Sequence, residues 1–205
     1  MTVIPIPVGE MQTNCYLVYE QPQDAVLIDP GAQAADILQV VRQKGAVIRA
    51  VFLTHAHFDH MMAAEEVKKA CQAPLLVHGE ERQGLEDGMR NLSLPMTGQN
   101  CCVKADRFLS DGEVVEIGSL RLRVWHTPGH TRGSCCYELE QARLLFSGDT
   151  LFYHSYGRTD FPGGSEEQMQ QSVGRLLAIS GDEQVYPGHG PATTLAEERR
   201  CNPLR

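Results

Sequence analysis

The sequence predicts an α/β protein of the α+β type, in which two mixed β-sheets pack together and helices cover their outer faces. Strand-like segments come first and helices alternate with strands later, an order typical of this class. Residues 48–54 form a near-continuous apolar run, as expected for a strand buried on both faces. No linker or low-complexity tract divides the chain. We therefore expect a single domain over residues 1–205.

In the first half, the strand-like segments are short and apolar, with turn residues between them. They lie at residues 3–8, 15–19, 25–28, 48–54 and 74–77. Residues 34–44 read as an amphipathic helix that Gly45 ends, and residues 62–71 are helical in composition. Residues 82–106 have little periodicity. We expect a short helix and an irregular connection there.

The second half repeats the order of strands, helix and strand. Its predicted strands lie at residues 114–117, 120–125, 134–139, 143–146 and 184–186. Residues 166–179 form a good amphipathic helix, with Ser165 as its N-cap and acidic residues in its first turn. A last short helix is expected over residues 195–200.

The composition excludes several functional classes. Eighteen basic and 26 acidic residues give a net charge of −8, which repels phosphate backbones and argues against nucleic-acid binding. No apolar run is long enough to span a membrane. The N-terminal segment does not resemble a signal peptide, and the seven cysteines include no CxxC pair. These features predict reduced thiols and a cytoplasmic location.

The segment Thr-His-Ala-His-Phe-Asp-His at residues 54–60 carries the strongest chemical signal. Its potential metal ligands are His55, His57, Asp59 and His60, at the end of a predicted buried strand. Alternate residues of an extended chain point the same way, and chain reach keeps all four within about 10 Å. Zinc, iron and manganese accept imidazole and carboxylate ligands. Chance rarely gathers so many ligands in six positions, so we predict a metal site.

Three further loops each carry one residue of ligand type. His130 lies in Thr-Pro-Gly-His-Thr, Asp149 in Ser-Gly-Asp-Thr and His189 in Tyr-Pro-Gly-His-Gly. Each loop follows a predicted strand and contains glycine, as a tight turn requires. Loops at one edge of a sheet sandwich can converge on one point. The sequence therefore predicts that these residues join the histidine cluster.

The motifs HxHxDH, PGHT, GD and PGHG, in this order, resemble the metallo-β-lactamase fold, and the resemblance covers nearly the whole chain. Within that fold, residues 13–18 (TNCYLV) and 157–164 (GRTDFPGG) are similar to short, single-domain glyoxalase II proteins, which are hydroxyacylglutathione hydrolase-like. The resemblance implies an αββα sandwich.

The resemblance also implies two divalent cations, with zinc as the first expectation and iron or manganese as alternatives. The first cation would be held by His55, His57 and His130. The second would be held by Asp59, His60 and His189. Asp149 would bridge the two.

Such a site suits hydrolysis of a small anionic thioester. Two divalent cations with two carboxylates and one hydroxide keep a net positive charge, which favours an anionic substrate and intermediate. A metal-bridging hydroxide would attack the carbonyl of S-lactoylglutathione or a similar acyl thioester, and zinc would accept the departing sulfur. Asp59 would orient the attacking water and is our candidate catalytic side chain.

Residues beyond the ligands are candidates for supporting roles. Tyr156 and His154 follow Asp149 closely and are expected to line the substrate pocket. Arg158 and Asp160 are expected to pair, either to position the loop after Asp149 or as a plain structural ion pair.

Two departures from the family pattern concern substrate recognition. Met61 and Met62 stand where many relatives carry smaller residues, which would narrow the wall behind the cations. The chain ends shortly after His189, so the C-terminal helical domain that supplies glutathione contacts in two-domain glyoxalase II enzymes is not expected. Recognition of a glutathione conjugate would then come from the β-rich body or from a neighbouring subunit.

Other readings remain open. Persulfide dioxygenases share the fold and the GRxDF stretch, and there His55, His130 and Asp149 would hold one ferrous iron and act on glutathione persulfide. The Pro-Gly-Gly continuation at residues 162–164 favours the hydrolases. A lactonase of the same fold is a further alternative. A cytoplasmic location disfavours a β-lactamase, and the acidic charge disfavours a nuclease.

Overall fold

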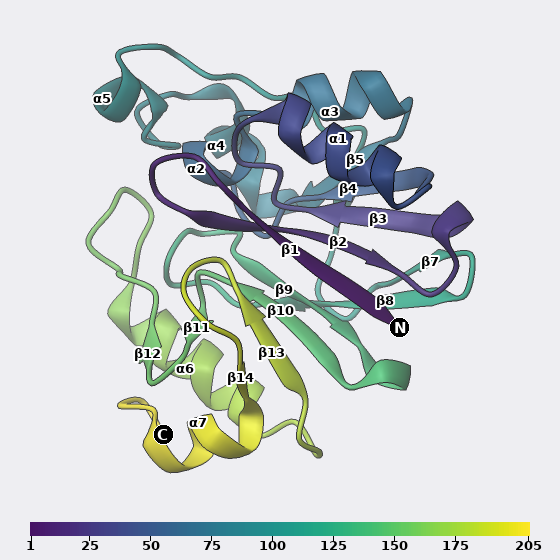
Figure 1. The fold of residues 1–205 in the computed structure, drawn as a ribbon. Helices are drawn as coiled ribbons and strands as arrows, with labels where there is room; N and C mark the ends of the chain where they lie inside the picture. The colour runs from purple at the N-terminus through teal and green to yellow at the C-terminus, as the bar shows by residue number, and fades with distance from the viewer.

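Two six-stranded β-sheets form the centre of the computed structural model, which describes residues 1–205 (Figure 1). The first sheet has the order β1 (Thr2–Val8), β2 (Thr13–Tyr19), β3 (Ala25–Ile28), β4 (Ile48–Phe52), β5 (Leu75–His78) and β6 (Arg107–Leu109). The second has the order β14 (Thr193–Thr194), β13 (Gln184–Pro187), β10 (Leu144–Gly148), β9 (Cys135–Leu139), β8 (Leu120–His126) and β7 (Val114–Ile117). Both sheets mix parallel and antiparallel pairs, as predicted.

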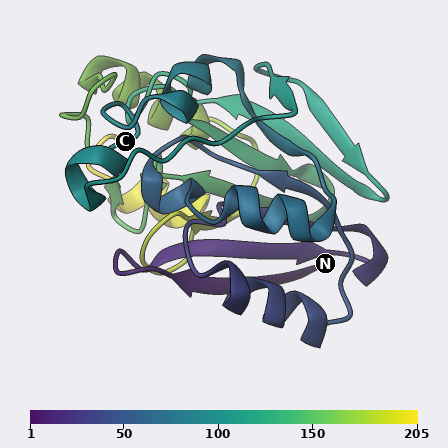
Figure 2. The same ribbon diagram turned by 90° about the horizontal axis from the view of Figure 1, so that it is seen from above.

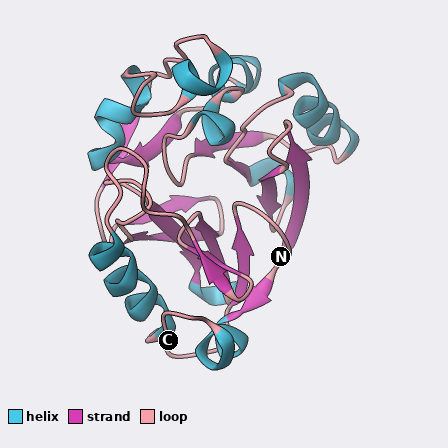
Figure 3. Cartoon of the chain, turned by 90° about the vertical axis from the view of Figure 1, so that its left-hand side faces the viewer, coloured by secondary structure: helices cyan, strands magenta, loops and turns pink.

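Helices cover the outer face of each sheet, which confirms the predicted αββα layers (Figures 1 and 3). The first sheet carries α1 (Ala34–Gln43) and α3 (Ala64–Cys71), and the second carries α6 (Glu166–Leu177) and α7 (Leu195–Cys201). The view from above shows α1 and α3 lying side by side along the first sheet (Figure 2). No helix combines the length and the apolar character that crossing a bilayer requires.

Shorter elements fill the connections. They are α2 (Phe58–Met61), α4 (Arg82–Glu86), α5 (Ser93–Thr97), the 3-10 turns η1 (Pro22–Asp24), η2 (Gly79–Glu81) and η3 (Glu140–Ala142), and the small hairpin β11 (Leu151–Phe152) with β12 (Ser155–Tyr156). As expected, Ser165 caps α6, because its hydroxyl accepts a hydrogen bond from the backbone N–H of Gln168 at 3.3 Å.

Successive side chains of a strand point to opposite faces of its sheet, and this alternation separates two apolar layers. In β2, Tyr16 and Val18 face the second sheet, whereas Cys15 and Leu17 face the helices on the other side. All four side chains are buried. A strand buried on both faces has little place for polar side chains, which explains its continuous apolar sequence.

The structure corrects some expected boundaries. The helix predicted over residues 62–71 begins at Ala64, as α3, and a separate short helix that was not predicted, α2, precedes it. The two do not join, because the backbone N–H of Ala63 donates to the carbonyl of Pro30 at 3.1 Å instead of continuing the first helix. Strands β6, β11, β12 and β14 were not predicted. Each has only two or three residues, too few for a periodic pattern.

The sheets bring four loops to one edge of the sandwich. Strands β3 and β4 are parallel, so the segments that follow them emerge at the same edge. Strands β10 and β13 are parallel as well, and they bring the loops with Asp149 and His189 together.

A polar contact ties the two sheets together at this edge. The Tyr16 hydroxyl donates to the carbonyl of Pro187 at 2.7 Å, and the Asn14 side-chain amide donates to the same carbonyl and to that of Gly190, both at 3.0 Å. These bonds run from β2 of the first sheet to the loop after β13 of the second. They fix the position of that loop, which carries His189.

Replacing Tyr16 by phenylalanine should therefore lower the free energy of unfolding by about 1 kcal/mol, the usual net value of one buried hydrogen bond. Urea unfolding followed by circular dichroism measures it. Tyr153→Phe is the control, because Tyr153 is 47 % exposed and its loss should change little. Equal stabilities of the two variants would contradict this role of Tyr16.

Candidate metal centre

Seven side chains from four loops and α2 meet at the shared edge of the sheets. They are His55 and His57 after β4, Asp59 and His60 in α2, His130 after β8, Asp149 after β10 and His189 after β13. Their donor atoms form three overlapping groups, and within each group all atoms lie within 4.8 Å of one another. One of these groups, His55, His60 and Asp149, shares a histidine with each of the other two. The structure thus brings together all the residues that the sequence singled out as metal ligands.

The first group consists of His55, His57 and His130, which are all buried. Nδ1 of His57 lies 2.8 Å from Nε2 of His130. The Nδ1–H of His130 donates to the carbonyl of Arg158 at 2.7 Å, and the Nδ1–H of His55 donates to the Thr54 hydroxyl at 3.1 Å. These acceptors fix the ring tautomers and leave the Nε2 lone pairs of His55 and His130 directed into the group.

The second group consists of Asp59, His60 and His189. Nε2 of His189 lies 3.2 Å from Oδ2 of Asp59 and 3.4 Å from Nε2 of His60. The hydroxyl of Thr13 donates to Asp59 at 2.8 Å. The Nδ1–H of His189 donates to the carbonyl of Met11 at 3.2 Å, so Nε2 again faces inward.

Asp149 lies between the two groups. Its Oδ1 is 3.4 Å from Nε2 of His60, and its Oδ2 is 3.4 Å from Nε2 of His130. One carboxylate therefore presents an oxygen to each group.

The protonation states reflect this crowding. Burial, reinforced by the imidazole of His130, lowers the pKa of His57 to about 3, so its ring is neutral and can offer a lone pair. Burial alone would also lower the pKa of His60, but the nearby carboxylates, first Asp149 and then Asp59, raise it well above its usual value. Burial raises the pKa of Asp149, yet the nearby imidazoles, first His60 and then His130 and His189, together outweigh it and lower the value to about 2. Burial also raises the pKa of Asp59, but His60, His189 and the Thr13 hydroxyl lower it well below its usual value. Both carboxylates are therefore ionised at neutral pH.

Unpaired buried atoms test whether the residues fit a metal. Buried polar atoms normally have hydrogen-bond partners, and leaving one without costs about 1–3 kcal/mol. Nε2 of His55, Nε2 of His57 and Oδ1 of Asp149 are buried and have no hydrogen-bond partner. A cation in each group would satisfy Nε2 of His55 and Oδ1 of Asp149. The two groups are thus suited to a dinuclear metal site.

Asp29 is a buried supporting residue that the sequence reasoning missed. Its carboxylate accepts hydrogen bonds from the backbone and the hydroxyl of Thr54, both at 2.7 Å, and from Nδ1 of His60 at 2.9 Å. It therefore orients His60 directly and His55 through Thr54, which affects both groups. The available signal was an acidic residue directly after the strand predicted at residues 25–28.

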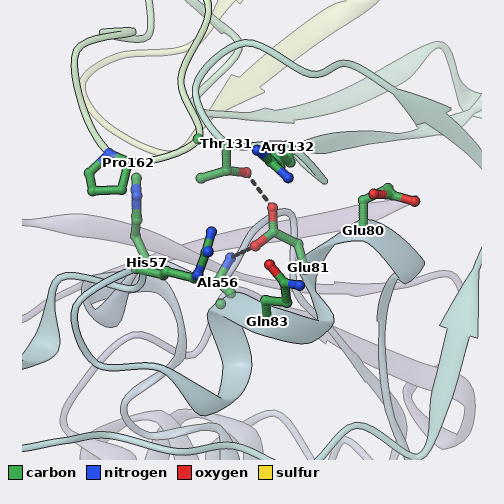
Figure 4. A pocket seen from close by; sticks show the side chains of 11 residues that line it. Ala56, His57, Glu80, Glu81, Gln83, Thr131, Arg132 and Pro162 are labelled. Carbon is green, nitrogen blue, oxygen red and sulfur yellow. Dashed lines mark hydrogen bonds between the residues drawn. The ribbon is translucent and has the colours of Figure 1, made fainter.

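Glu81 is a second such residue, and it joins two ligand-bearing loops (Figure 4). Its carboxylate accepts from the backbone N–H of Ala56 at 3.1 Å, from that of Gly133 at 2.9 Å and from the hydroxyl of Thr131. Burial raises the pKa of Glu81, and these hydrogen bonds oppose the rise. Ala56 lies between His55 and His57 in sequence, and Thr131 directly follows His130. No sequence pattern pointed to Glu81.

The four candidate supporting residues make contacts outside the seven-residue cluster. The Tyr156 hydroxyl donates to Glu166 at the start of α6. Nε2 of His154 pairs with the carboxylate of Glu197 in α7 at 2.8 Å. Arg158 and Asp160 do pair, with two hydrogen bonds of 2.7 and 2.6 Å, on the exposed surface. Arg158 reaches a ligand through its backbone carbonyl rather than through its side chain.

Residues 8–189 match the Metallo-beta-lactamase superfamily. The chain belongs to this superfamily. Over its whole length it is 32% identical to the hydroxyacylglutathione hydrolase GloC of Haemophilus influenzae, covering 98% of that protein. It is 36% identical to the probable metallo-hydrolase YqgX of Bacillus subtilis, with 97% of this chain and 95% of the relative covered. The chain is accordingly a metallo-hydrolase of the metallo-β-lactamase fold.

Solved structures of superfamily members agree with this assignment. The BLEG-1 B3 metallo-beta-lactamase is 37% identical, with a TM-score of 0.94 and 99% of each chain covered. TTHA1623, solved in a di-iron-bound form, is 35% identical, with a TM-score of 0.89 and 99% and 100% covered. ETHE1 from Myxococcus xanthus is 33% identical, with a TM-score of 0.78 and 99% and 84% covered.

Gly188 should be essential for metal binding in this superfamily member. A Cβ added there would lie 2.2 Å from Oδ1 of Asp149 and 2.7 Å from Cε1 of His60. Gly188→Ala should therefore displace Asp149 and weaken zinc binding at least tenfold, as measured by isothermal titration calorimetry. Gly174→Ala in α6 is the matched control, because its Cβ would meet no atom within 4 Å. Zinc binding by Gly188→Ala as tight as that of the control would disprove this constraint.

Removing the carboxylate of Glu81 should weaken both the fold and metal binding. Glu81→Ala leaves the backbone N–H groups of Ala56 and Gly133 without a partner and removes an acceptor of the Thr131 hydroxyl, so we expect a loss of about 3 kcal/mol in the free energy of unfolding. Zinc affinity should fall by about 10- to 100-fold, as for other residues that orient ligand loops. Denaturant unfolding and zinc titration measure the two effects. Glu80→Gln, an exposed neighbour, should leave both unchanged. If Glu81→Ala binds zinc normally, the carboxylate does not position these loops.

Proposed function

We propose that the protein is a metal-dependent thioester hydrolase similar to glyoxalase II, acting on S-lactoylglutathione or a similar acyl thioester. The observation that carries the proposal is the pair of donor groups joined by Asp149. Full-length similarity to a hydroxyacylglutathione hydrolase supports it. The substrate would be a small anionic molecule, the location cytoplasmic, and residues 1–205 one catalytic domain that binds neither nucleic acid nor membrane.

Each group of side chains would hold one divalent cation. The first would bind His55, His57 and His130, the second would bind Asp59, His60 and His189, and Asp149 would bridge them. Bound there, the cations would supply hydroxide near neutral pH and stabilise negative charge on a carbonyl oxygen and a departing thiolate. We propose zinc because it accepts sulfur well. Iron is the alternative, and a similar structure was solved in a di-iron form.

The chain's own residues would orient the reactants. Asp59 belongs to the second group and also lines a groove on the surface, so its carboxylate can accept a hydrogen bond from the attacking water. The Thr13 hydroxyl donates a hydrogen bond of 2.8 Å to the same carboxylate. Asp29 keeps His60 in the tautomer that presents Nε2 to the site. We propose Asp59 as the catalytic side chain and the other two as positioning residues.

A mononuclear iron persulfide dioxygenase is the second candidate. It would use His55, His130 and Asp149 alone, and similarity to ETHE1 fits this alternative. The complete second group, which a single iron would leave unused, favours the hydrolase. A lactonase would use the same two groups and differs only in its substrate.

Purified protein of known metal content should hydrolyse S-lactoylglutathione, lose this activity on chelation and regain it with zinc. Asp149→Asn should lower kcat/KM by about a hundredfold or more, whereas the exposed Asp36→Asn should not change it. Parallel assays with glutathione persulfide and an oxygen electrode, an acyl-homoserine lactone and a chromogenic β-lactam test the alternatives. Full thioester hydrolysis without metal, or one iron with oxygen uptake, would refute the proposal.

A further inference from the structure

Three exposed methionines from separate elements line one groove. Met11 comes from the turn between β1 and β2, Met62 follows α2, and Met96 belongs to α5. They are 50, 42 and 58% exposed, although methionine is an apolar residue. The groove has a volume of about 380 Å³, which lies in the range of small-molecule sites.

The groove opens directly onto the second group of donor atoms. Asp59 forms part of its wall, and Oδ2 of Asp59 lies 3.2 Å from Nε2 of His189. The backbone carbonyl of Met11, another lining residue, accepts the Nδ1–H of the same histidine at 3.2 Å. A molecule that reacts at a cation held by Asp59 would therefore lie next to this groove.

The chemistry of the walls indicates which part of a substrate fits. Six of the eleven lining residues are hydrophobic, and the charged ones, Glu10 and Asp59, are both acidic. Acidic walls repel an anionic thiol carrier such as glutathione. Flexible thioethers, by contrast, adapt to apolar chains of different shapes. The groove thus favours the neutral, apolar arm of a thioester.

The side of the centre next to His57 is different. There the lining residues include Arg90, Arg132, Glu80 and Gln83, and only one of the eleven is hydrophobic (Figure 4). Arginine side chains bind carboxylates, which a peptide-like thiol carrier has. This side therefore offers arginine side chains to the carboxylates of a thiol carrier, which the methionine groove does not.

We propose that the groove of Met11, Met62 and Met96 binds the acyl chain, so that the preferred substrates are thioesters with an aliphatic acyl chain of several carbons rather than the small polar lactoyl group. This inference rests on the proposed thioesterase function. Burying each additional methylene should raise kcat/KM by up to about fourfold until the groove is filled.

The test uses a series of S-acyl glutathione thioesters from acetyl to octanoyl, with S-lactoylglutathione for comparison. We expect kcat/KM to rise with chain length in the native protein. Met62→Ser and Met96→Ser should each reduce this rise with chain length. Met89→Ser is the matched control, because Met89 is 56% exposed but does not line the groove.

A binding measurement separates this inference from the proposed function. S-methyl and S-hexyl glutathione are thioethers that cannot be hydrolysed, and calorimetry of the zinc-loaded protein gives their Kd values. The hexyl compound should bind at least tenfold more tightly, and Met62→Ser with Met96→Ser should remove the difference. Equal Kd values in the native protein overturn the groove proposal even if thioesters are hydrolysed. A retained hexyl preference without any hydrolysis supports the groove and refutes the thioesterase.

Discussion

The buried carboxylate of Asp29 is the contact on which the geometry of the centre depends. It accepts three hydrogen bonds from two segments, the residues just after β4 and helix α2. A buried charge requires such partners, so any movement of these segments would leave it uncompensated. The first sheet and the histidine-rich segment therefore form one rigid unit.

The arrangement of charges around this unit follows from the same requirement. His60 lies between Asp29 on one side and Asp59 and Asp149 on the other, and these carboxylates keep its ring protonated until a cation replaces the proton. His57, which is buried beside another imidazole, stays neutral. The site thus offers both neutral nitrogen donors and ionised oxygen donors, the mixture that divalent transition metals bind.

The methionine groove and the polar side next to His57 differ in the chemistry that they offer a substrate. Met11 both lines the apolar groove and accepts a hydrogen bond from His189, so the turn between β1 and β2 joins substrate contact and ligand orientation. On the opposite side, Glu81 joins the loops of the first group within a polar surface that includes Arg132. Under this proposal, the acyl chain of a thioester would lie in the methionine groove, and its thiol carrier would lie near Arg132.

Local sequence determined most strands, the helices α1 and α6, and the identity of the seven clustered residues, because apolar periodicity and ligand spacing are properties of short segments. The tertiary structure alone decided the rest. Strands of two or three residues exist only through their pairing partners, and the break between α2 and α3 depends on the carbonyl of Pro30. Asp29, Glu81 and the groove of Met11, Met62 and Met96 have no sequence motif. Their roles arise from contacts between residues far apart in the chain, which only the packing of the two sheets creates.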